Sequence, residues 1–130
     1  MATRENYDDG KVINGTGAAD SIVNNRGGNN VSINAGAGDD SIWTSGHNVT
    51  VSGGTGNDYL WRENGAGIAY VYSGGNDTIS GFDVTNSTLV IADSYTTLKN
   101  DSTVTITVEG KGTITLVNYF LRTTSISYRL

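Results

Sequence analysis

Cysteine and proline are absent from the 130 residues of this chain, and histidine and methionine occur once each. Without cysteine the chain forms no disulfide framework, no thiolate metal site and no cysteine nucleophile. The lack of proline and of a three-residue glycine period excludes a collagen helix. No apolar run approaches the roughly 18 residues that a membrane-spanning helix needs. The first residues, from Met1 to Glu5, are polar, so we expect no signal peptide there.

Glycine and acidic residues are abundant instead. The sequence holds 18 glycines, about twice the usual share of ~7%. Its 13 acidic and 8 basic side chains give a net charge of −5. This balance argues against a nucleic-acid partner and favours a cation. A mass of 13.7 kDa is enough for one domain.

An internal repeat carries most of the information in the sequence. Four aspartates follow one another at intervals of 20, 18 and 19 residues, and each has an aliphatic residue two positions later and a tiny residue two positions earlier. The aspartates are Asp20, Asp40, Asp58 and Asp77; the aliphatic residues are Ile22, Ile42, Leu60 and Ile79; the tiny residues are Ala18, Gly38, Gly56 and Gly75. We therefore expect four copies of one structural unit.

Only one of the two turns in each copy has a constant length. The distance from Val31, Val49 or Ile68 to the next aspartate is always nine residues, whereas the preceding connection varies between seven and nine. Loops that only connect tolerate insertions. A turn of constant length therefore has a role, beyond connecting two strands, that fixes its geometry.

The pattern predicts an all-β fold. Segments such as 31–33 and 49–51 alternate apolar and small polar residues, as strands buried on one face do. Turns rich in glycine and asparagine separate them. We expect a parallel β-roll or β-solenoid of about four coils over residues 1–82. Residues 83–130 are expected to form a C-terminal cap of antiparallel strands, with a hairpin over 103–117 around the turn at Glu109 to Gly112.

The constant turns have the geometry that a calcium site requires. Neighbouring strands of a sheet lie ~4.7–4.9 Å apart, and calcium–oxygen distances are ~2.3–2.6 Å. An ion midway between two coils therefore reaches a carboxylate on each, and glycine-rich turns let carbonyl oxygens point at the same ion. Magnesium requires ~2.0–2.1 Å and near-octahedral geometry, so it fits this spacing poorly.

These turns resemble a known calcium-binding repeat. Residues 53–61 read GGTGNDYLW and match every defined position of G-G-x-G-x-D-x-U-x, while residues 35–43 lack only the first glycine. The chain is thus similar to the hemolysin-type, or repeats-in-toxin (RTX), family. The resemblance implies a parallel β-roll with Ca²⁺ between neighbouring loops. It also implies the ligands: the carboxylates of Asp20, Asp40, Asp58 and Asp77, and main-chain carbonyls of Ala35, Gly36, Ala37, Gly38, Gly53, Gly54, Thr55, Gly56, Ser73 and Gly75.

The chain departs from the family in its alternate turns. The turns at 26–30, 45–48 and 62–67 contain no aspartate, so we expect up to three ions along one edge only. The gap between Asp20 and Asp40 fits least well, since Thr16 and Ala18 replace motif glycines. The alternative is an ordinary β-solenoid whose aspartates cap turns. Asp83 and Asp93 are candidates for another ion, although solvation or turn capping explains them more simply.

Little in the sequence suggests catalysis. The H-E-x-x-H and G-x-S-x-G motifs are missing, and we expect no enzyme activity. His47 lies in a variable turn, where we expect an exposed side chain. Trp43 and Trp61 share one column of the repeat, one residue after the inward aliphatic position. They are expected on the outer face, where they form a glycan platform or simply stack on each other.

The sequence favours a calcium-binding structural module of a secreted bacterial protein that folds on binding Ca²⁺ outside the cell. The RTX resemblance implies export by type I secretion. One alternative is a surface adhesin or carbohydrate-binding module. Another is the accessory C-terminal domain of a secreted lipase, protease or epimerase. In each case the expected partners are calcium ions, with carbohydrate or a catalytic domain of the parent protein as further candidates.

Overall fold

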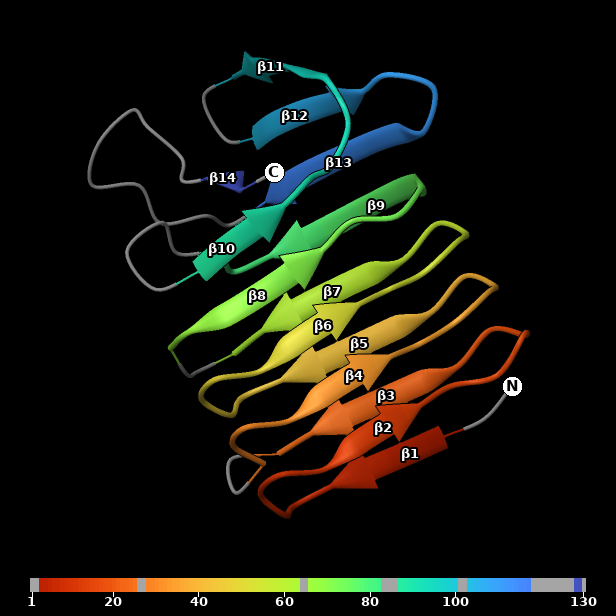
Figure 1. Cartoon of the computed structure of the whole chain (residues 1–130), viewed down its shortest axis with the longest axis vertical. Coiled ribbons are helices and arrows are strands. Elements are labelled where there is room, and N and C mark those ends of the chain that lie inside the picture. Colours follow the sequence, from red (N-terminus) through yellow and green to blue (C-terminus); the bar gives the residue numbers. More distant parts are fainter. Residues whose placement is uncertain are drawn as a thin grey trace.

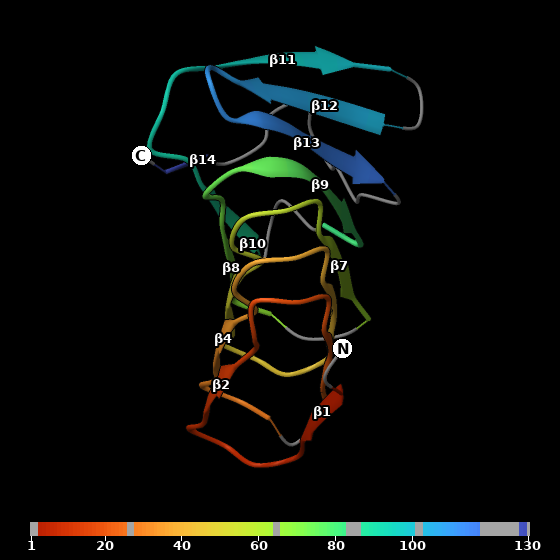
Figure 2. The same ribbon diagram turned by 90° about the vertical axis from the view of Figure 1, so that its right-hand side faces the viewer.

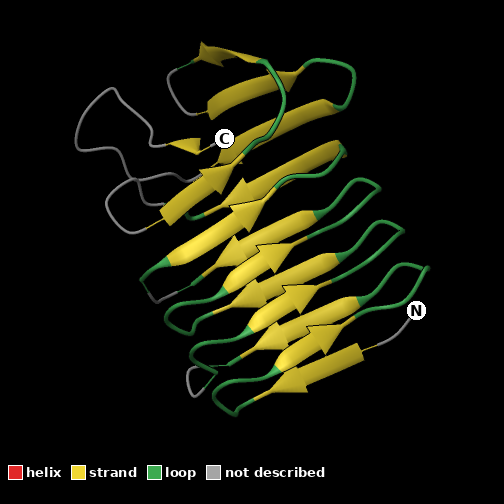
Figure 3. Cartoon of the chain, viewed as in Figure 1, coloured by secondary structure: helices red, strands yellow, loops and turns green. Residues whose placement is uncertain are grey.

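The computed structural model of the chain describes residues 3–25, 28–63, 66–82, 87–100, 103–117 and 128–129. Every regular element among these residues is a strand (Figure 3). A helix able to cross a membrane is accordingly not found within the described ranges.

The strands form two sheets. The first contains, in spatial order, β1 (Thr3–Asn6), β3 (Ser21–Asn24), β5 (Ser41–Thr44), β7 (Tyr59–Arg62), β9 (Gly75–Ser80), β13 (Gly112–Val117), β12 (Thr103–Val108) and β11 (Tyr95–Lys99). The second contains β14 (Tyr128–Arg129), β10 (Ser87–Val90), β8 (Ile68–Val71), β6 (Thr50–Ser52), β4 (Ser32–Asn34) and β2 (Val12–Asn14).

From β1 to β10, successive strands alternate between the two sheets, which face each other across a narrow core (Figures 1 and 2). Equivalent strands of successive coils pair in parallel and in register. Ile22 lies beside Ile42, which lies beside Leu60, and Ile33 lies beside Val51 in the facing sheet. The predicted parallel β-solenoid of about four turns is therefore confirmed.

The core consists of the inward side chains of each strand. Ile22, Ile42 and Ile79 are no more than 2% exposed, and the residue before each of them in its strand is a small polar residue that is exposed or half-buried. Wider side chains fill the last coil, where the rings of Tyr70 and Phe82 lie 5.8 Å apart. Since every coil buries only a few side chains, each one depends on the next for its stability.

The carboxyl-terminal part ends the stack with antiparallel pairing. β12 pairs antiparallel with β13 and with β11, so the predicted hairpin over 103–117 is confirmed. β13 pairs in parallel with β9, with Gly112 beside Gly75. Within the expected cap, β10 also pairs in parallel with β8 and so extends the second sheet of the solenoid. Ile126, an apolar residue of the expected cap, lies outside the described ranges.

Candidate functional site

The four aspartates lie in one column along one edge of the solenoid, which we call the aspartate edge. It consists of the turns at 15–20, 35–40, 53–58 and 72–77, which lead from the second sheet to the first, on the right in Figure 1. Each aspartate directly precedes the first residue at which the first-sheet strands of neighbouring coils pair in register. All four side chains are buried, at 2% to 5% exposure.

One carboxylate oxygen of each later aspartate accepts a hydrogen bond from the preceding coil. The amide of Asp20 donates to Oδ1 of Asp40 at 2.8 Å, and the amide of Asp40 donates to Oδ1 of Asp58 at 2.9 Å. The amide of Asp58 donates to Oδ1 of Asp77 at 2.9 Å. This ladder holds the four carboxylates at the spacing of the coils.

The second oxygen differs between the first and the middle coils. Oδ2 of Asp40 and Oδ2 of Asp58 are buried and have no hydrogen-bond partner. Asp20, in contrast, accepts from the amide of Thr16 at 2.6 Å and from its hydroxyl at 2.9 Å. The threonine that replaces a motif glycine thus satisfies the first carboxylate within its own turn, while the two middle carboxylates each keep an unpartnered acceptor.

The column is electrostatically strained. Burial raises the pKa of Asp58 to about 7, against a hydrogen bond from the Asp40 amide, and the charges of Asp77 and Asp40 add to the rise. Burial likewise raises the pKa of Asp77 to about 6. Asp40 has a raised pKa for the same reason, together with the charge of Asp20. Buried carboxylates in a row therefore bind protons readily, which shows that the edge favours positive charge.

Main-chain oxygens face the gaps between the turns. A Cβ added to Gly54 would overlap the carbonyl oxygen of Gly36, and one added to Gly56 would overlap that of Gly38. A Cβ on Gly53 would overlap Oδ2 of Asp58. Carbonyl and carboxylate oxygens thus lie close to spaces that only glycine leaves open, and such a donor set suits a hard cation such as Ca²⁺.

The other predicted carbonyl donors lie in the same turns. Ala35 is buried, whereas Ala37, Thr55 and Ser73 are exposed. In the fourth turn the carbonyl of Gly75 already accepts a hydrogen bond from the hydroxyl of Tyr72 at 2.7 Å. The last gap is therefore built differently from the middle ones.

A second, exposed ladder runs beside the first, and the sequence interpretation missed it. Oδ1 of Asp39 accepts from the amide of Asn57, and Oδ1 of Asn57 accepts from the amide of Asn76, both at 2.8 Å. Oδ1 of Asn76 in turn accepts from the amide of Thr113 at 3.1 Å, which connects the cap to the last coil. The sequence did hold a signal for this ladder, because an Asp or Asn directly precedes three of the four aspartates of the repeat.

The opposite edge of the solenoid, which we call the asparagine edge, contains a ladder of buried neutral side chains. Nδ2 of Asn6 donates to Oδ1 of Asn24 at 2.8 Å, and Nδ2 of Asn24 donates to Oγ1 of Thr44 at 3.2 Å. Asn24 also donates to the carbonyl of Gly28 at 2.8 Å. His47 is exposed on this edge, as predicted, and its Nδ1 accepts from the amide of Ala66. Residues 26–27 and 64–65 of these turns lie outside the described ranges.

The two tryptophans lie side by side on the outer face of the first sheet, as expected. Trp43 pairs with Trp61 in register, and the ring centroids are 5.9 Å apart at 52°. They border a shallow hollow of about 90 Å³ together with side chains that include Ser21, Ser41 and Tyr59. Nε1 of Trp43 is buried and has no hydrogen-bond partner.

No group of three or more histidine, cysteine, aspartate or glutamate side chains gathers within the described part of the chain. A metal at the aspartate edge would therefore depend on main-chain oxygens as well as on paired carboxylates. Asp83 lies outside the described residues, and Asp93 is exposed. No protein-family model matches this chain, and no curated protein matches it in sequence.

Proposed function

We propose that the aspartate edge binds Ca²⁺ and that the chain is an RTX-like calcium-binding structural module. The observation that carries this proposal is the pair of buried, unpartnered oxygens, Oδ2 of Asp40 and Oδ2 of Asp58. A buried acceptor without a donor is costly, and an unpaired buried charge is more so. A cation supplies the missing partner to both.

The middle of the column is the best supported position. Asp40 and Asp58 would hold an ion together with carbonyl oxygens of the turns at 35–38 and 53–56, and Asp58 and Asp77 would hold another. The gap between Asp20 and Asp40 is weaker, because Thr16 already satisfies the carboxylate of Asp20. Up to three ions along the edge remain the proposal, with the first bound least tightly.

Calcium would act by stabilising the folded stack. A ligand that binds the folded chain and not the unfolded one adds RT ln(1 + [L]/Kd) to stability. Extracellular calcium modules typically bind at about 10⁻⁴–10⁻³ M, so the coils would close only outside the cell. We propose a secreted bacterial protein, exported by type I secretion, in which this module has no catalytic role of its own. In a parent lipase, protease or epimerase it would be an accessory domain.

Thermal unfolding followed by circular dichroism tests the proposal. A CaCl₂ concentration of about 5 mM is roughly ten times a Kd of ~0.5 mM. Its addition to calcium-free buffer at about pH 7.5 is therefore expected to stabilise the fold by about 1.4 kcal/mol per ion. The double substitution Asp40→Asn with Asp58→Asn is expected to abolish this gain. Asp8→Asn, an exposed aspartate on the other edge, is the matched control and keeps it. An equal unfolding temperature with calcium and with chelator would contradict the proposal.

A second candidate function is carbohydrate binding at the outer face, favoured by the hollow that Trp43 and Trp61 border with serine and tyrosine residues. Indole rings suit the apolar face of a sugar ring. Because the chain has no other tryptophan, tryptophan emission excited at a wavelength that tyrosine does not absorb reports on this site alone. Titration with neutral oligosaccharides is expected to change the emission, and Trp61→Ala to remove binding, whereas Tyr7→Ala, an exposed aromatic elsewhere, leaves it intact. Unchanged emission across the series would eliminate this candidate.

A further inference from the structure

The first gap of the aspartate edge lies between the turns at 15–20 and 35–40. Its main-chain oxygens are placed as in the next gap. A Cβ added to Gly36 would overlap the carbonyl oxygen of Thr16, as a Cβ added to Gly54 would overlap that of Gly36. The first gap thus has a carbonyl oxygen at the same place, and the difference between the gaps lies elsewhere.

The carboxylate of Asp20 also lies in its turn as that of Asp58 lies in its own. A Cβ on Gly15 would overlap Oδ2 of Asp20, and a Cβ on Gly53 would overlap Oδ2 of Asp58. Both aspartates are buried, at 2% exposure. The two gaps are therefore alike in the oxygen atoms that they could offer to an ion.

The turns differ at the position that Thr16 occupies. Gly36 and Gly54 take this position in the next two turns, with φ of +97° and +83°, whereas the φ of Thr16 is not positive. The amide of Thr16 donates to Oδ2 of Asp20 at 2.6 Å, and its hydroxyl donates to Oδ1 at 2.9 Å. In the turns that have glycine here, Oδ2 of the following aspartate has no partner. The residue at this position therefore decides whether a turn satisfies its own carboxylate.

Building on the proposed function, on which this inference rests, we propose that Thr16 takes the place of an ion in the first gap. Only the two later gaps of the aspartate edge then bind calcium. Hydrogens of the amide and the hydroxyl of Thr16 already point at lone pairs of Asp20. A cation at these oxygens would have to displace both donors, because donor hydrogens and the ion are positively charged and compete for the same lone pairs.

Thr16 also gives the first coil a stability that does not depend on calcium. Hydrogen bonds to a charged group are among the stronger ones in proteins, and these lie within a single turn. The hydroxyl oxygen accepts in addition from the amide of Ala18 at 3.2 Å, which orients the hydroxyl. Each coil of a solenoid is stabilised by its neighbours. The first coil therefore closes without an ion and offers a template to the coils that follow.

The calcium dependence of the folding equilibrium measures how many ions the folded chain holds. Above its Kd, each bound ion raises the folding equilibrium constant about tenfold for a tenfold rise in calcium. In urea unfolding of the full chain at constant ionic strength, a rise from about 5 to about 50 mM CaCl₂ should increase this constant about a hundredfold. Thr16→Gly removes the hydroxyl and permits the left-handed backbone of the later turns. The same rise in calcium should then increase the constant about a thousandfold.

Two further variants of the first turn separate the effect of the hydroxyl from that of the added glycine. Thr16→Ser keeps a hydroxyl at the same position. Ala19→Gly adds a glycine to the same turn at an exposed residue and leaves Thr16 in place. Both variants should keep the response of about a hundredfold.

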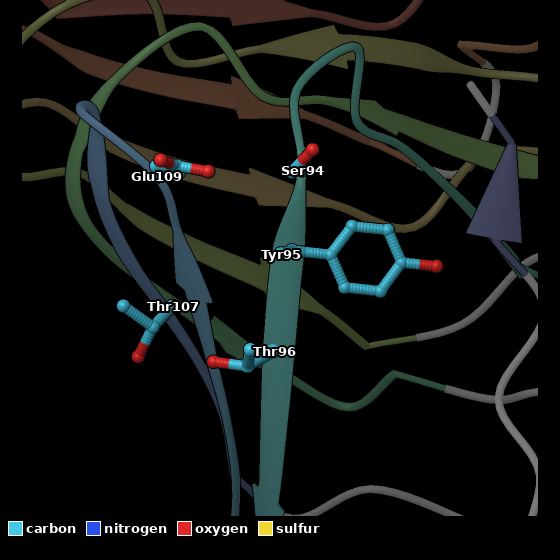
Figure 4. Close-up of a pocket in the computed structure, with 5 residues that line it drawn as sticks. All are labelled: Ser94, Tyr95, Thr96, Thr107 and Glu109. Carbon is cyan, nitrogen blue, oxygen red and sulfur yellow. The ribbon is translucent and has the colours of Figure 1, made fainter.

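Calcium bound away from the aspartate edge is controlled for at the carboxyl-terminal end of the molecule. Glu109 borders a hollow of about 280 Å³ with oxygen-bearing side chains that include Ser94, Thr96 and Thr107 (Figure 4). Glu109→Gln removes the carboxylate of this hollow and should leave the calcium response unchanged. A lower response would mean that one of the ions lies in the hollow, and the assignment of ions to the two later gaps would be wrong.

Thr16→Val tests the role of the hydroxyl without calcium. The substitution keeps the shape of the side chain and removes one donor from Asp20. In chelator the unfolding temperature should fall by roughly 5 °C, while Thr16→Ser should stay near the parent chain. An unchanged unfolding temperature for Thr16→Val would overturn the role of Thr16, whatever calcium does at the later gaps.

The calcium responses separate the failure of this inference from the failure of the proposed function. A response of about a thousandfold in the parent chain, or of about a hundredfold in Thr16→Gly, would overturn the role of Thr16 and leave calcium binding at the edge intact. A parent chain whose folding equilibrium does not respond to calcium would contradict the proposed function, and the role of Thr16 with it.

Discussion

The two edges of the solenoid bury side chains of nearly the same size and differ in their charge. On the asparagine edge, Asn24 is 0% exposed and is paired at both of its side-chain atoms. On the aspartate edge, Asp58 is 2% exposed, and only one of its two oxygens has a partner. An amide both donates and accepts, whereas a carboxylate only accepts. A column of amides can therefore satisfy itself, and a column of carboxylates needs donors or cations from outside.

This difference gives the two edges different tasks. The asparagine edge holds the coils together at any ion concentration, because its hydrogen bonds are internal. The carboxylates of the aspartate edge oppose folding by their desolvation and mutual repulsion, and under the proposed function a bound cation would offset this cost. The molecule thus combines one edge that is always stabilising with one whose contribution depends on its surroundings.

The largest expected effect comes from a methyl group between the turns of the aspartate edge. Gly54 has φ of +83°, and an added Cβ would overlap the carbonyl of Gly36. Gly54→Ala is expected to destabilise the chain by about 4 kcal/mol or to prevent folding. Gly17→Ala is the matched control, because a Cβ there has no atom within 4 Å, and should change stability by less than about 0.5 kcal/mol. Urea unfolding followed by circular dichroism distinguishes them. Similar midpoints for both variants would show that the turns are not closely stacked.

The next largest effect is expected on the asparagine edge. Asn24→Ala leaves Asn6, Thr44 and the carbonyl of Gly28 without their bonds to this side chain. The expected loss is about 3 kcal/mol, and it should be the same in calcium and in chelator. Asn34→Ala, at an exposed strand end, should cost less than about 0.5 kcal/mol. A loss at Asn24 that depended on calcium would contradict the division of tasks between the two edges.

The repeat made much of this arrangement predictable. The column of Asp20, Asp40, Asp58 and Asp77 and the matching aliphatic column follow from spacing alone, because in-register stacking places equivalent residues side by side. The hairpin over 103–117 follows from local alternation and a glycine turn. In each case the sequence neighbours of a residue determine its partners.

The parts that were missed depend on pairing between distant segments. β13 joins β9 across 37 residues, through Asn76 and Thr113, and local periodicity does not encode that choice. The ladder of the asparagine edge has the spacing of the repeat, but its members are two asparagines and a threonine, so no single residue type marks the column. Which carboxylate oxygens lack a partner depends on turn geometry, as the contrast between Thr16 and Gly54 shows.

The pH dependence of stability separates the edges further. Burial raises the pKa of Asp58 to about 7 and that of Asp77 to about 6, from 3.8. The folded chain then binds more protons than the unfolded chain between about pH 4 and 7, so stability without calcium falls as pH rises through this window and levels off above it. We expect the unfolding temperature in calcium-free buffer to decrease by roughly 5 °C from pH 5 to pH 8.

Saturating calcium is expected to reverse this trend, because the ion competes with the protons for the same carboxylates. Differential scanning calorimetry at pH 5, 6, 7 and 8, with and without calcium, measures both slopes. The Asn24→Ala variant should show the same pair of slopes at lower temperatures. A calcium-free unfolding temperature that rises from pH 5 to pH 8 would contradict the raised pKa values of the column.

The smallest expected effect is the most specific one, because its sign depends on calcium. Asp58→Asn keeps Oδ1 for the hydrogen bond from the amide of Asp40 and removes a buried charge between two others. Without calcium at pH 8 the substitution is therefore expected to raise the unfolding temperature by about 3 °C. In saturating calcium the substitution should lower the unfolding temperature relative to the parent chain, because one carboxylate ligand is lost from the two gaps that Asp58 borders. The control Asp8→Asn removes the same charge on the other edge, where its side chain is exposed, and should shift neither value. A decrease without calcium would mean that the charge of Asp58 stabilises the fold by itself, and the aspartate column would then be a structural counterpart of the asparagine ladder that needs no ion.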